Sequence, residues 1–451
     1  MKLLPHQIED AAFLASKKFA GNFSGMGSGK TLTALEALLN LGFNYSDGAG
    51  SSGTFQTIII GPPISLHMWK VEYEQHTGGC AQIVKTGKQV LDPHDDAYIM
   101  SYEIATKRRD ELKALGAKVL ICDESHALKS PGAKRTHALI GADGLCESVD
   151  HTWLLTGTPS TRYNDDLFTF MARAANGSLK EKIGRIDLSR FRLRYCITQK
   201  KRFSPKQRFL TEVTVGNRNT EELNDMLFGG GMAVRRELAD VWAQMPPLTI
   251  NRLQVELDRS PELREMLKTL EGQTMTQIQR DMASNDEHLA TIRRKLGVAK
   301  VKHSVKEIVS RIESGVRPIL VGAWHTSVID ALVVALSAAD IDVCVIDGRT
   351  PANKRQQFVD WFNNGSIDVM IGQISAMGVS LNMQGGSHII CVEEDFSPST
   401  MSQFYARCHR IGQANHVHVD IFSSDTKLDE AIRRISQTKA RGHRDLLEQE
   451  D

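Results

Sequence analysis

The octet Ser24–Thr31, which reads Ser-Gly-Met-Gly-Ser-Gly-Lys-Thr, constrains the fold of this 451-residue chain more than any other stretch. Its glycines let the backbone curl so that several N–H groups face one anion, and the helical pattern that follows adds the positive end of a helix dipole. In such a loop the lysine charge serves the β- and γ-phosphates of a nucleotide, and the final hydroxyl serves Mg²⁺. An ordinary glycine-rich turn does not account for the Gly-Lys-Thr ending. The residues expected to surround the phosphates are Gly25, Gly27, Ser28, Gly29, Lys30 and Thr31.

Short apolar runs alternate with amphipathic stretches, once over about 1–160 and again over about 315–430. Buried strands separated by helices are typical of parallel α/β sheets, so the pattern predicts two α/β lobes. Helices are expected at Thr31–Leu41 and Asp330–Ala339. The expected strands are Thr57–Gly61, Ala97–Ser101, Lys118–Cys122, Thr152–Thr156, Pro318–Ala323, Asp342–Ile346, Val369–Gly372, His388–Val392 and His416–Ile421.

The region between the lobes has a different pattern. Residues 160–310 are rich in charge and helix formers, show few strand signals, and are interrupted by glycine and proline runs. We therefore expect helical elaborations and the hinge here. The expected domains are 1–165 as the nucleotide-binding lobe, 166–250 as a helical insertion and linker, and 251–451 as the second lobe, with a helical insertion at about 258–312 and a C-terminal helix.

Two acids follow the apolar run 119–122. Asp123 would hold Mg²⁺ through its water shell, and Glu124 would orient and deprotonate the attacking water. Acids after a strand often only cap the next helix, so the pair alone is a weak signal. About ninety residues after a phosphate loop, it indicates ATP hydrolysis, and His126 could couple this site to the rest of the lobe.

A third strand end, Leu154–Pro159, carries two hydroxyls and a glycine. The simpler interpretation is a strand-to-turn signal. In a motor, Thr156 and Thr158 would relay the state of the γ-phosphate to the rest of the lobe.

The stretch Gln403–Gln413 carries two arginines three residues apart, Arg407 and Arg410. That spacing puts both on one face of a helix, from which two guanidiniums could stabilise the charge of phosphoryl transfer. They belong to the second lobe and the phosphate loop to the first, so hydrolysis would require the lobes to close. The alternative, a solvated basic helix face, explains neither the glutamines nor the Ile-Gly-Gln ending.

With these motifs in view, the chain resembles the Snf family of DNA translocases, a branch of the superfamily 2 helicases, over nearly its whole length. Arg407–Gln413 matches the family's R-x-H-R-I-G-Q motif and is the most specific match. Other stretches similar to family motifs are Leu4–Gln7, Gly61–Leu66 with Trp69, Ser101–Glu103, His126–Ser130, Asp347–Thr350 and Ser375–Asn382. Finer features, such as Phe191–Cys196 and Arg235-Arg236, resemble the annealing-helicase subgroup. The compact chain looks like a phage or bacterial protein.

The resemblance implies two tandem RecA-like P-loop lobes that use ATP and Mg²⁺. It implies that Gln7 contacts adenine, that Gln403 belongs to the ATP site, and that Gly378 helps to couple ATP to DNA. The DNA contacts that it implies are Pro62, Ser65, Ser101, Tyr102, Thr350 and Ser375.

Composition neither supports nor excludes DNA binding, because the net charge is only +1. A DNA groove must therefore be local and offset by acidic surface elsewhere. Three basic clusters occur, at 107–109, 200–202 and 293–295. We expect one of them to contact DNA, although such clusters are more often solvated faces.

The seven cysteines include no C-x-x-C pair, which argues against zinc and against a disulfide scaffold. No signal peptide and no apolar run of about 18 residues is present, so neither secretion nor a membrane span is expected. We expect a monomer in the cytoplasm of a bacterial or phage-infected cell, or in the nucleus of a eukaryote.

The expected function is ATP-dependent translocation on duplex or branched DNA, as in branch migration, fork remodelling or reannealing during replication, recombination or repair. One alternative is a helicase that separates strands of DNA or RNA, and another is a motor that displaces a DNA-bound protein. A silent binding scaffold is a third, and the intact Lys30, Asp123, Glu124, Arg407 and Arg410 argue against it.

Overall fold

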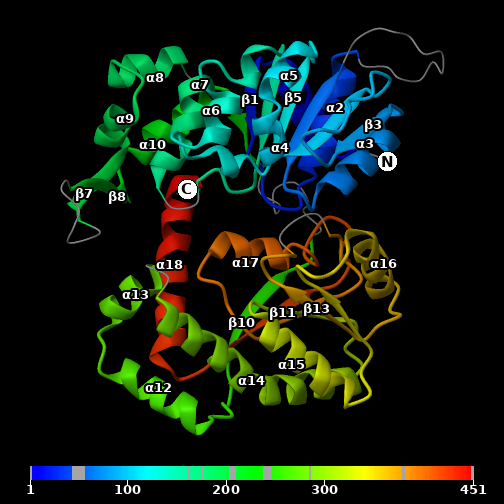
Figure 1. The fold of residues 1–451 in the computed structure, drawn as a ribbon, viewed down its shortest axis with the longest axis vertical. Coiled ribbons are helices and arrows are strands. Elements are labelled where there is room, and N and C mark those ends of the chain that lie inside the picture. The colour runs from blue at the N-terminus through cyan, green and yellow to red at the C-terminus, as the bar shows by residue number, and fades with distance from the viewer. Residues whose placement is uncertain are drawn as a thin grey trace. The chain divides into compact units, whose positions relative to one another are not determined.

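Two parallel β-sheets, one in each part of the chain, organise the computed structural model (Figure 1). Contacts within the chain define unit 1, Met1–Val241 with Arg441–Asp451, and unit 2, Trp242–Ala440. Each unit is described by itself. The structure describes residues 3–42, 56–160, 163–174, 176–202, 210–236, 245–283, 286–377 and 381–447.

The sheet of unit 1 has seven parallel strands in the order β3-β4-β2-β5-β6-β1-β9. Its inner strands are buried on both faces, so they are continuously apolar rather than alternating. In β5, Val119 and Ile121 pack under α1, α2 and α3, while Leu120 and Cys122 face α4 to α7. The strands are β1 Phe19–Asn22, β2 Thr57–Gly61, β3 Ala81–Val84, β4 Ala97–Ser101, β5 Val119–Asp123, β6 His151–Leu155 and β9 Ala233–Val234.

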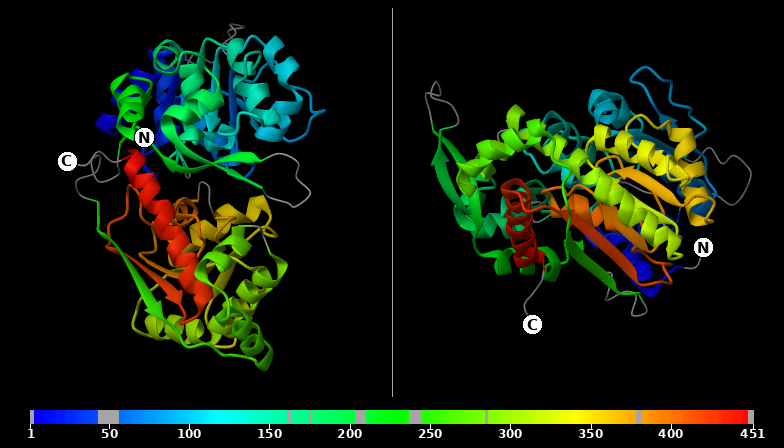
Figure 2. Two further views of the ribbon diagram at one scale, coloured as in Figure 1. Left: turned by 90° about the vertical axis from the view of Figure 1, so that its left-hand side faces the viewer. Right: turned by 90° about the horizontal axis from the view of Figure 1, so that it is seen from below.

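The helices of unit 1 cover both faces of this sheet and continue beyond it (Figure 2). They are α1 Pro5–Ala15, α2 Lys30–Asn40, α3 Leu66–Thr77, α4 Tyr102–Lys107, α5 Arg109–Ala114, α6 Lys134–Ile140, α7 Phe168–Ala174, α8 Asn176–Ile183, α9 Leu188–Tyr195 and α10 Thr220–Asn224. Short 3₁₀ turns are η1 Ser125–Leu128, η2 Leu145–Glu147 and η3 Asn164–Leu167, and η4 Asp225–Gly229 is a π-turn. A separate antiparallel hairpin joins β7 Cys196–Lys201 to β8 Thr211–Asn217.

The sheet of unit 2 has six parallel strands in the order β10-β15-β14-β11-β13-β12. One face packs against α14 and α15 and the other against α16 and α17, while α12, α13 and the first turns of α18 form a smaller apolar cluster with α14. The strands are β10 Leu248–Gln254, β11 Ile319–Ala323, β12 Val343–Ile346, β13 Val369–Gln373, β14 His388–Cys391 and β15 Val417–Ser423. The helices are α12 Pro261–Glu271, α13 Met275–Ala283, α14 Glu287–Glu313, α15 Thr326–Ser337, α16 Ala352–Asn363, α17 Pro398–Tyr405 and α18 Lys427–Leu447.

The predicted pair of parallel α/β lobes is confirmed, and each of the nine predicted strands corresponds to a strand within two residues at either end. The middle region was expected to be helical, and there the prediction is wrong in part, because β7, β8, β9 and β10 lie in it. The expected boundary at residue 165 also does not coincide with a boundary between units. Phe170 and Met171 pack in the core of unit 1, and β9 extends its sheet. In the part of the chain that the structure describes, no helix has both the length and the apolarity to cross a membrane.

Candidate active site

The phosphate loop connects β1 to α2 and is held in a tight ring by its own lysine. Gly27 and Gly29 adopt φ values of +80° and +82°, a region that a side chain would strain. The Lys30 Nζ donates to the carbonyl oxygens of Ser24 and Gly25 at 2.9 and 3.0 Å. The lysine charge is therefore centred on the loop, where the sequence predicted it would meet phosphate.

A segment more than 200 residues away supports the loop. The Gly25 N–H donates to the carbonyl of Arg236 at 2.7 Å, and the Arg236 N–H donates to Ser24 Oγ at 3.1 Å. The Arg236 guanidinium in turn donates to buried Asp10 at 3.1 Å, and this contact opposes the rise that burial causes in the pKa of Asp10. The sequence marked Arg236 only as a subgroup feature, and nothing in it predicted this supporting role.

Gln7, the expected adenine contact, is buried against the base of the loop. Its Oε1 accepts from the Leu4 N–H at 2.9 Å, and its Nε2 donates weakly to the Ser28 carbonyl at 3.4 Å. A Cβ at Gly29 would lie 2.1 Å from Gln7 Nε2, so the Gln7 amide would have to shift, and the φ value of +82° favours glycine here. The adenine contact itself stays a prediction.

Asp123 lies at the end of β5 with both carboxylate oxygens oriented by donors. Trp69 Nε1 donates to Oδ2 at 2.8 Å, and the Glu124 N–H donates to Oδ1 at 2.9 Å. The Tyr102 hydroxyl donates to the Asp123 carbonyl at 2.7 Å and so fixes the backbone. The sequence marks Trp69 only as part of a stretch similar to a family motif, and its position 54 residues before Asp123 gives no signal for this bond.

The electrostatics of the two acids fit a divalent cation. Burial, and then the neighbouring Glu124, raise the pKa of Asp123 from 3.8 to about 6, although the Trp69 hydrogen bond and the Lys30 charge oppose the rise. Two adjacent carboxylates in a buried site disfavour each other's charge, and hard oxygen ligands are those that Mg²⁺ prefers. At the loop, the Ser28 hydroxyl is buried and has no hydrogen-bond partner among the described residues. The carboxylate of Asp123 thus fits Mg²⁺, and the loop fits a phosphate. Thr31 as a second magnesium ligand stays a prediction.

Glu124 belongs to a chain of contacts that reaches the next strand end. Its backbone has φ +49°, a left-handed conformation that is uncommon outside glycine. His126 Nδ1 lies 3.2 Å from Glu124 Oε2 and 3.4 Å from Thr156 Oγ1, and Thr156 Oγ1 accepts from the Thr158 N–H at 3.1 Å. The structure therefore brings together the predicted base and the predicted coupling residues of unit 1. Their role in coupling stays a prediction.

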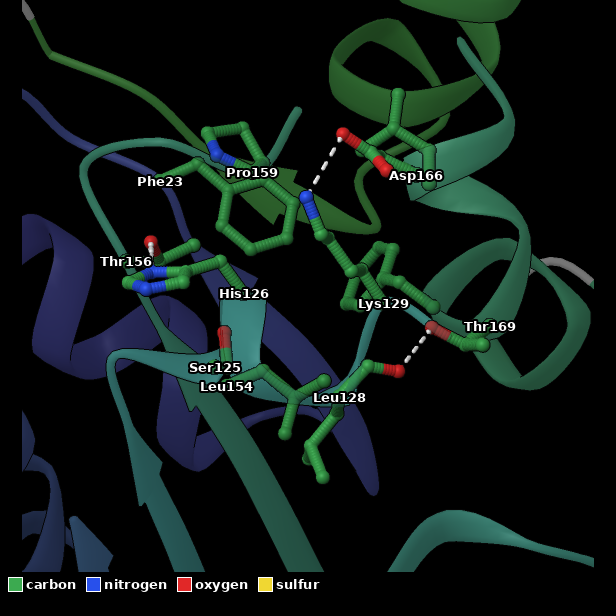
Figure 3. A pocket seen from close by; sticks show the side chains of 12 residues that line it. Phe23, Ser125, His126, Leu128, Lys129, Leu154, Thr156, Pro159, Asp166 and Thr169 are labelled. Carbon is green, nitrogen blue, oxygen red and sulfur yellow. Dashed lines mark hydrogen bonds and ion pairs between the residues drawn. The ribbon is translucent and has the colours of Figure 1, made fainter. Parts of the chain in front are cut away.

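A small pocket lies beside this chain of contacts (Figure 3). His126 and Thr156 line it on one side. The opposite wall includes Lys129, whose Nζ lies 3.5 Å from Asp166, and Thr169, whose hydroxyl donates to the Leu128 carbonyl at 2.9 Å. The side chains of His126 and Thr156 therefore border a small pocket.

The two arginines of unit 2 do not share a helix face, so that prediction is wrong. Helix α17 ends at Tyr405, and Arg407 and Arg410 lie in the turns that follow. The Arg407 guanidinium instead donates to the carbonyls of Gln403, in the last turns of the helix, and of Leu381 at 2.9 and 3.4 Å. Arg407 is thus buried and covers the end of the helix.

The glutamine and glycine after the arginines have structural roles. Gln413 is buried, and its Nε2 lies within 3.1 Å of the carbonyl oxygens of Gln384, Gly386 and Cys408. Gly412 has φ +98°, which favours glycine. The Ile-Gly-Gln ending therefore fixes the turn that carries both arginines.

The six residues expected to contact DNA lie in different environments. Ser65, Ser101 and Tyr102 are buried, and their hydroxyls are engaged in hydrogen bonds within unit 1. Thr350 donates to the Val345 carbonyl. Pro62 is partly exposed and Ser375 is exposed. DNA contact by these residues stays a prediction, and Gly378 lies outside the described residues.

The phosphate loop, the paired acids and the two parallel α/β units define a P-loop nucleoside-triphosphatase of the helicase type. Residues 6–296 match the SNF2-related domain and residues 299–412 match the helicase conserved C-terminal domain. The chain therefore belongs to the SNF2-related family of helicase-type ATPases. Membership in this family implies that ATP is the nucleotide used.

Relatives with names in DNA metabolism are similar over much of this chain. DNA repair and recombination protein RAD54B of Homo sapiens is 25% identical over 96% of this chain and 54% of its own length. DNA annealing helicase and endonuclease ZRANB3 of Bos taurus is 25% identical over 73% of this chain and 30% of its own length. A regulator-of-chromatin subfamily A-like protein 1 homolog of Caenorhabditis elegans is 28% identical over 76% of this chain and 47% of its own. The chain thus spans about half the length of such relatives, or less.

A solved SWI2/SNF2 ATPase core from Sulfolobus solfataricus, in complex with dsDNA, aligns over 100% of this chain and 98% of its own with a TM-score of 0.43 and 17% identity.

Proposed function

We propose that this protein is an ATP-dependent translocase that couples hydrolysis to movement on duplex or branched DNA, in branch migration, fork remodelling or reannealing. One observation carries the proposal: in a chain of the SNF2-related family, Lys30, Asp123 and Glu124 lie at one sheet edge, and His126 joins Glu124 to the strand end at Thr156. The names of relatives, which include repair and recombination proteins and an annealing helicase, support DNA as the track.

The chemistry would divide among the residues as follows. Lys30 and the loop amides would bind the phosphates, and Glu124 would orient and deprotonate the attacking water. Mg²⁺, held by Asp123 and Thr31, would neutralise charge on the β- and γ-phosphates when it is bound. Arg407 and Arg410, supplied by the other unit, would stabilise the charge of the transition state, so that turnover would require closure of the two units.

The proposal is tested by steady-state ATP hydrolysis without nucleic acid and then with single-stranded, duplex, forked and four-way DNA and with RNA. Strong stimulation by duplex or branched DNA supports it, and displacement of a third strand from a DNA triplex would then establish translocation. Glu124→Gln is the matched control, because it keeps the shape of the side chain and removes the base. Stimulation by single strands alone would instead favour a strand-separating helicase. Absence of stimulation by any nucleic acid would overturn the proposal.

A further inference from the structure

Positive charge is concentrated in one stretch of unit 1. Residues 176–218 contain twelve Lys and Arg and three acidic residues, a net charge of +9 in a chain whose total is +1. The rest of the chain is therefore acidic overall. We call the described part of this stretch, which contains α8, α9, β7 and β8, the basic arm. Its charge is local because salt screens exposed charges beyond about 8–10 Å at physiological ionic strength.

Two of the three basic clusters have two of their three cations engaged in contacts within the fold, and one cation of each, Lys107 or Arg294, is exposed. In the cluster 107–109, Arg108 pairs with Glu111 at 2.6 Å and Arg109 pairs with Asp110 at 2.6 Å. These cations are already neutralised by neighbouring acids, so they offer little charge to a ligand.

The cluster 293–295 is similarly committed. Arg293 donates to the Glu394 carbonyl at 2.9 Å and lies over the ring of Trp324, while Lys295 pairs with Glu262 at 2.6 Å. Its cations hold α14 against its surroundings in unit 2.

The third cluster, Lys200-Lys201-Arg202 on the basic arm, differs from both. All three residues are exposed, and none of their side chains has a hydrogen-bond or ion-pair partner in the part of the chain that the structure describes. Because successive side chains of a strand point to opposite faces, Lys200 and Lys201 present charge on both faces of the hairpin. Such an element suits a ligand with negative charge on two sides, such as the walls of a groove or the arms of a fork.

The hairpin is mounted rigidly, although an isolated two-stranded hairpin is marginally stable. Asn164, at the start of η3, donates to the carbonyls of Tyr195 and Arg218 at 2.9 and 3.2 Å and so ties the two strand ends together. Asp165 accepts from Arg192 and from Thr214 in β8 at 2.8 and 2.7 Å. Figure 1 shows the hairpin extending away from α8, α9 and α10. Exposed charges at Lys200, Lys201 and Arg202, beside an anchored hairpin base, are the form expected of a binding element.

We propose that the basic arm grips the sugar-phosphate backbone of DNA, with Lys200, Lys201 and Arg202 as its phosphate contacts. The inference rests on the proposed function only in taking DNA as the negatively charged ligand. An acidic protein surface would also attract this arm, but the binding of such a protein would depend on contacts with the exposed apolar side chains Leu193 and Ile197. Phosphate contacts instead release counterions, and the affinity then falls steeply with salt.

The test uses the full chain with K200Q/K201Q/R202Q. Its matched control, K85Q/K88Q/K302Q, removes the same charge from exposed lysines elsewhere. Affinity for fluorescent duplex and forked DNA is measured by anisotropy at several salt concentrations. The arm variant should bind about tenfold or more weakly at moderate salt, and its slope of log K against log salt should fall by about 2–3, since each phosphate contact contributes about 0.9. ATP hydrolysis without DNA should match the wild type.

The outcomes separate this inference from the proposed function. If DNA stimulates the wild type and the arm variant keeps the slope of the control, the arm proposal is overturned alone. If the arm variant binds DNA unchanged while L193S/I197S loses DNA binding, the proposed phosphate contacts are equally overturned, and the binding belongs to apolar side chains of the same arm. If no DNA stimulates the wild type, yet DNA binding shows the salt dependence and depends on the arm, the translocase proposal fails while the arm proposal stands. K200R/K201R, which keeps the charge, should bind like the wild type.

Discussion

The two units hold their functional side chains in different ways. In unit 1, the acids are oriented largely by other side chains, as Trp69 does for Asp123 and His126 for Glu124. In unit 2, Arg407 and Gln413 donate to backbone carbonyls and hold the chain itself in shape. The difference teaches that a substitution at an acid of unit 1 can abolish catalysis without lowering stability. A substitution at Arg407 in unit 2 is expected to lower both catalysis and stability.

The largest effect is expected in unit 1. Glu124→Gln should abolish measurable hydrolysis because an amide cannot accept the proton of the attacking water. Lys30→Ala should do the same by removing the charge that meets the phosphates. Glu124→Gln should keep the free energy of unfolding within about 0.5 kcal/mol of the wild type, as changes off the core usually do. Lys30→Ala also removes the donor to the Ser24 and Gly25 carbonyls and should cost about 0.5–1.5 kcal/mol. Turnover assays and urea denaturation measure the two quantities, and a retained rate would contradict the assignment.

The next effect compares two arginines of unit 2. Arg410→Ala should lower turnover by on the order of 10³-fold, the range for arginine fingers. Arg407→Ala should lower turnover too and should also cost about 1–3 kcal/mol in unfolding free energy, because the carbonyls of Gln403 and Leu381 lose a buried donor. The comparison breaks down if Arg407→Ala unfolds at the same urea concentration as the wild type.

A third prediction concerns stability alone. Gln413→Ala should destabilise unit 2 by about 1–3 kcal/mol, since the two N–H groups of this buried amide are shared among three carbonyl oxygens. Gln413→Glu should be worse, because a carboxylate would face the same acceptors. Binding of a fluorescent ADP analogue to the phosphate loop should be unaffected in either variant. Weakened ADP binding would show that the phosphate loop of unit 1 depends on the backbone contacts of Gln413 in unit 2.

The smallest effect is a difference in pH response. The pKa of Asp123 is raised from 3.8 to about 6, so the folded state binds more protons in that window and unit 1 gains stability as the pH falls through it. Burial lowers the pKa of His409 from 6.5, so the unfolded state binds more protons and unit 2 loses stability as the pH falls below 6.5.

Hydrogen exchange without Mg²⁺, corrected for its intrinsic pH dependence, should show opposite trends for β5 and for the turn after α17. His409→Gln should flatten the second trend only. Parallel trends in both units would contradict the assignment of these two groups.

The sequence predicted the elements that depend on local pattern. Apolar runs marked most of the strands, and the phosphate loop was visible because glycine, lysine and threonine occur at fixed spacing. It could not predict β9, which has only two residues and exists because it pairs with β1. Nor could it predict that Trp69 orients Asp123 or that Arg236 supports the phosphate loop, because these partners are distant in sequence. Nothing in the sequence distinguishes these two residues from any other tryptophan or arginine. The arginines of unit 2 were predicted in kind but misplaced, because the helix ends before them.

The backbone at Glu124 has a consequence for engineering. A non-glycine residue with φ +49° costs on the order of 1 kcal/mol that glycine would not. Glu124→Gly should relieve this strain, with part of the gain offset by the entropy that glycine loses on folding, and should give a protein that cannot turn over. A screen for thermal stability alone could therefore select a variant without activity, because it would replace the residue on which turnover depends.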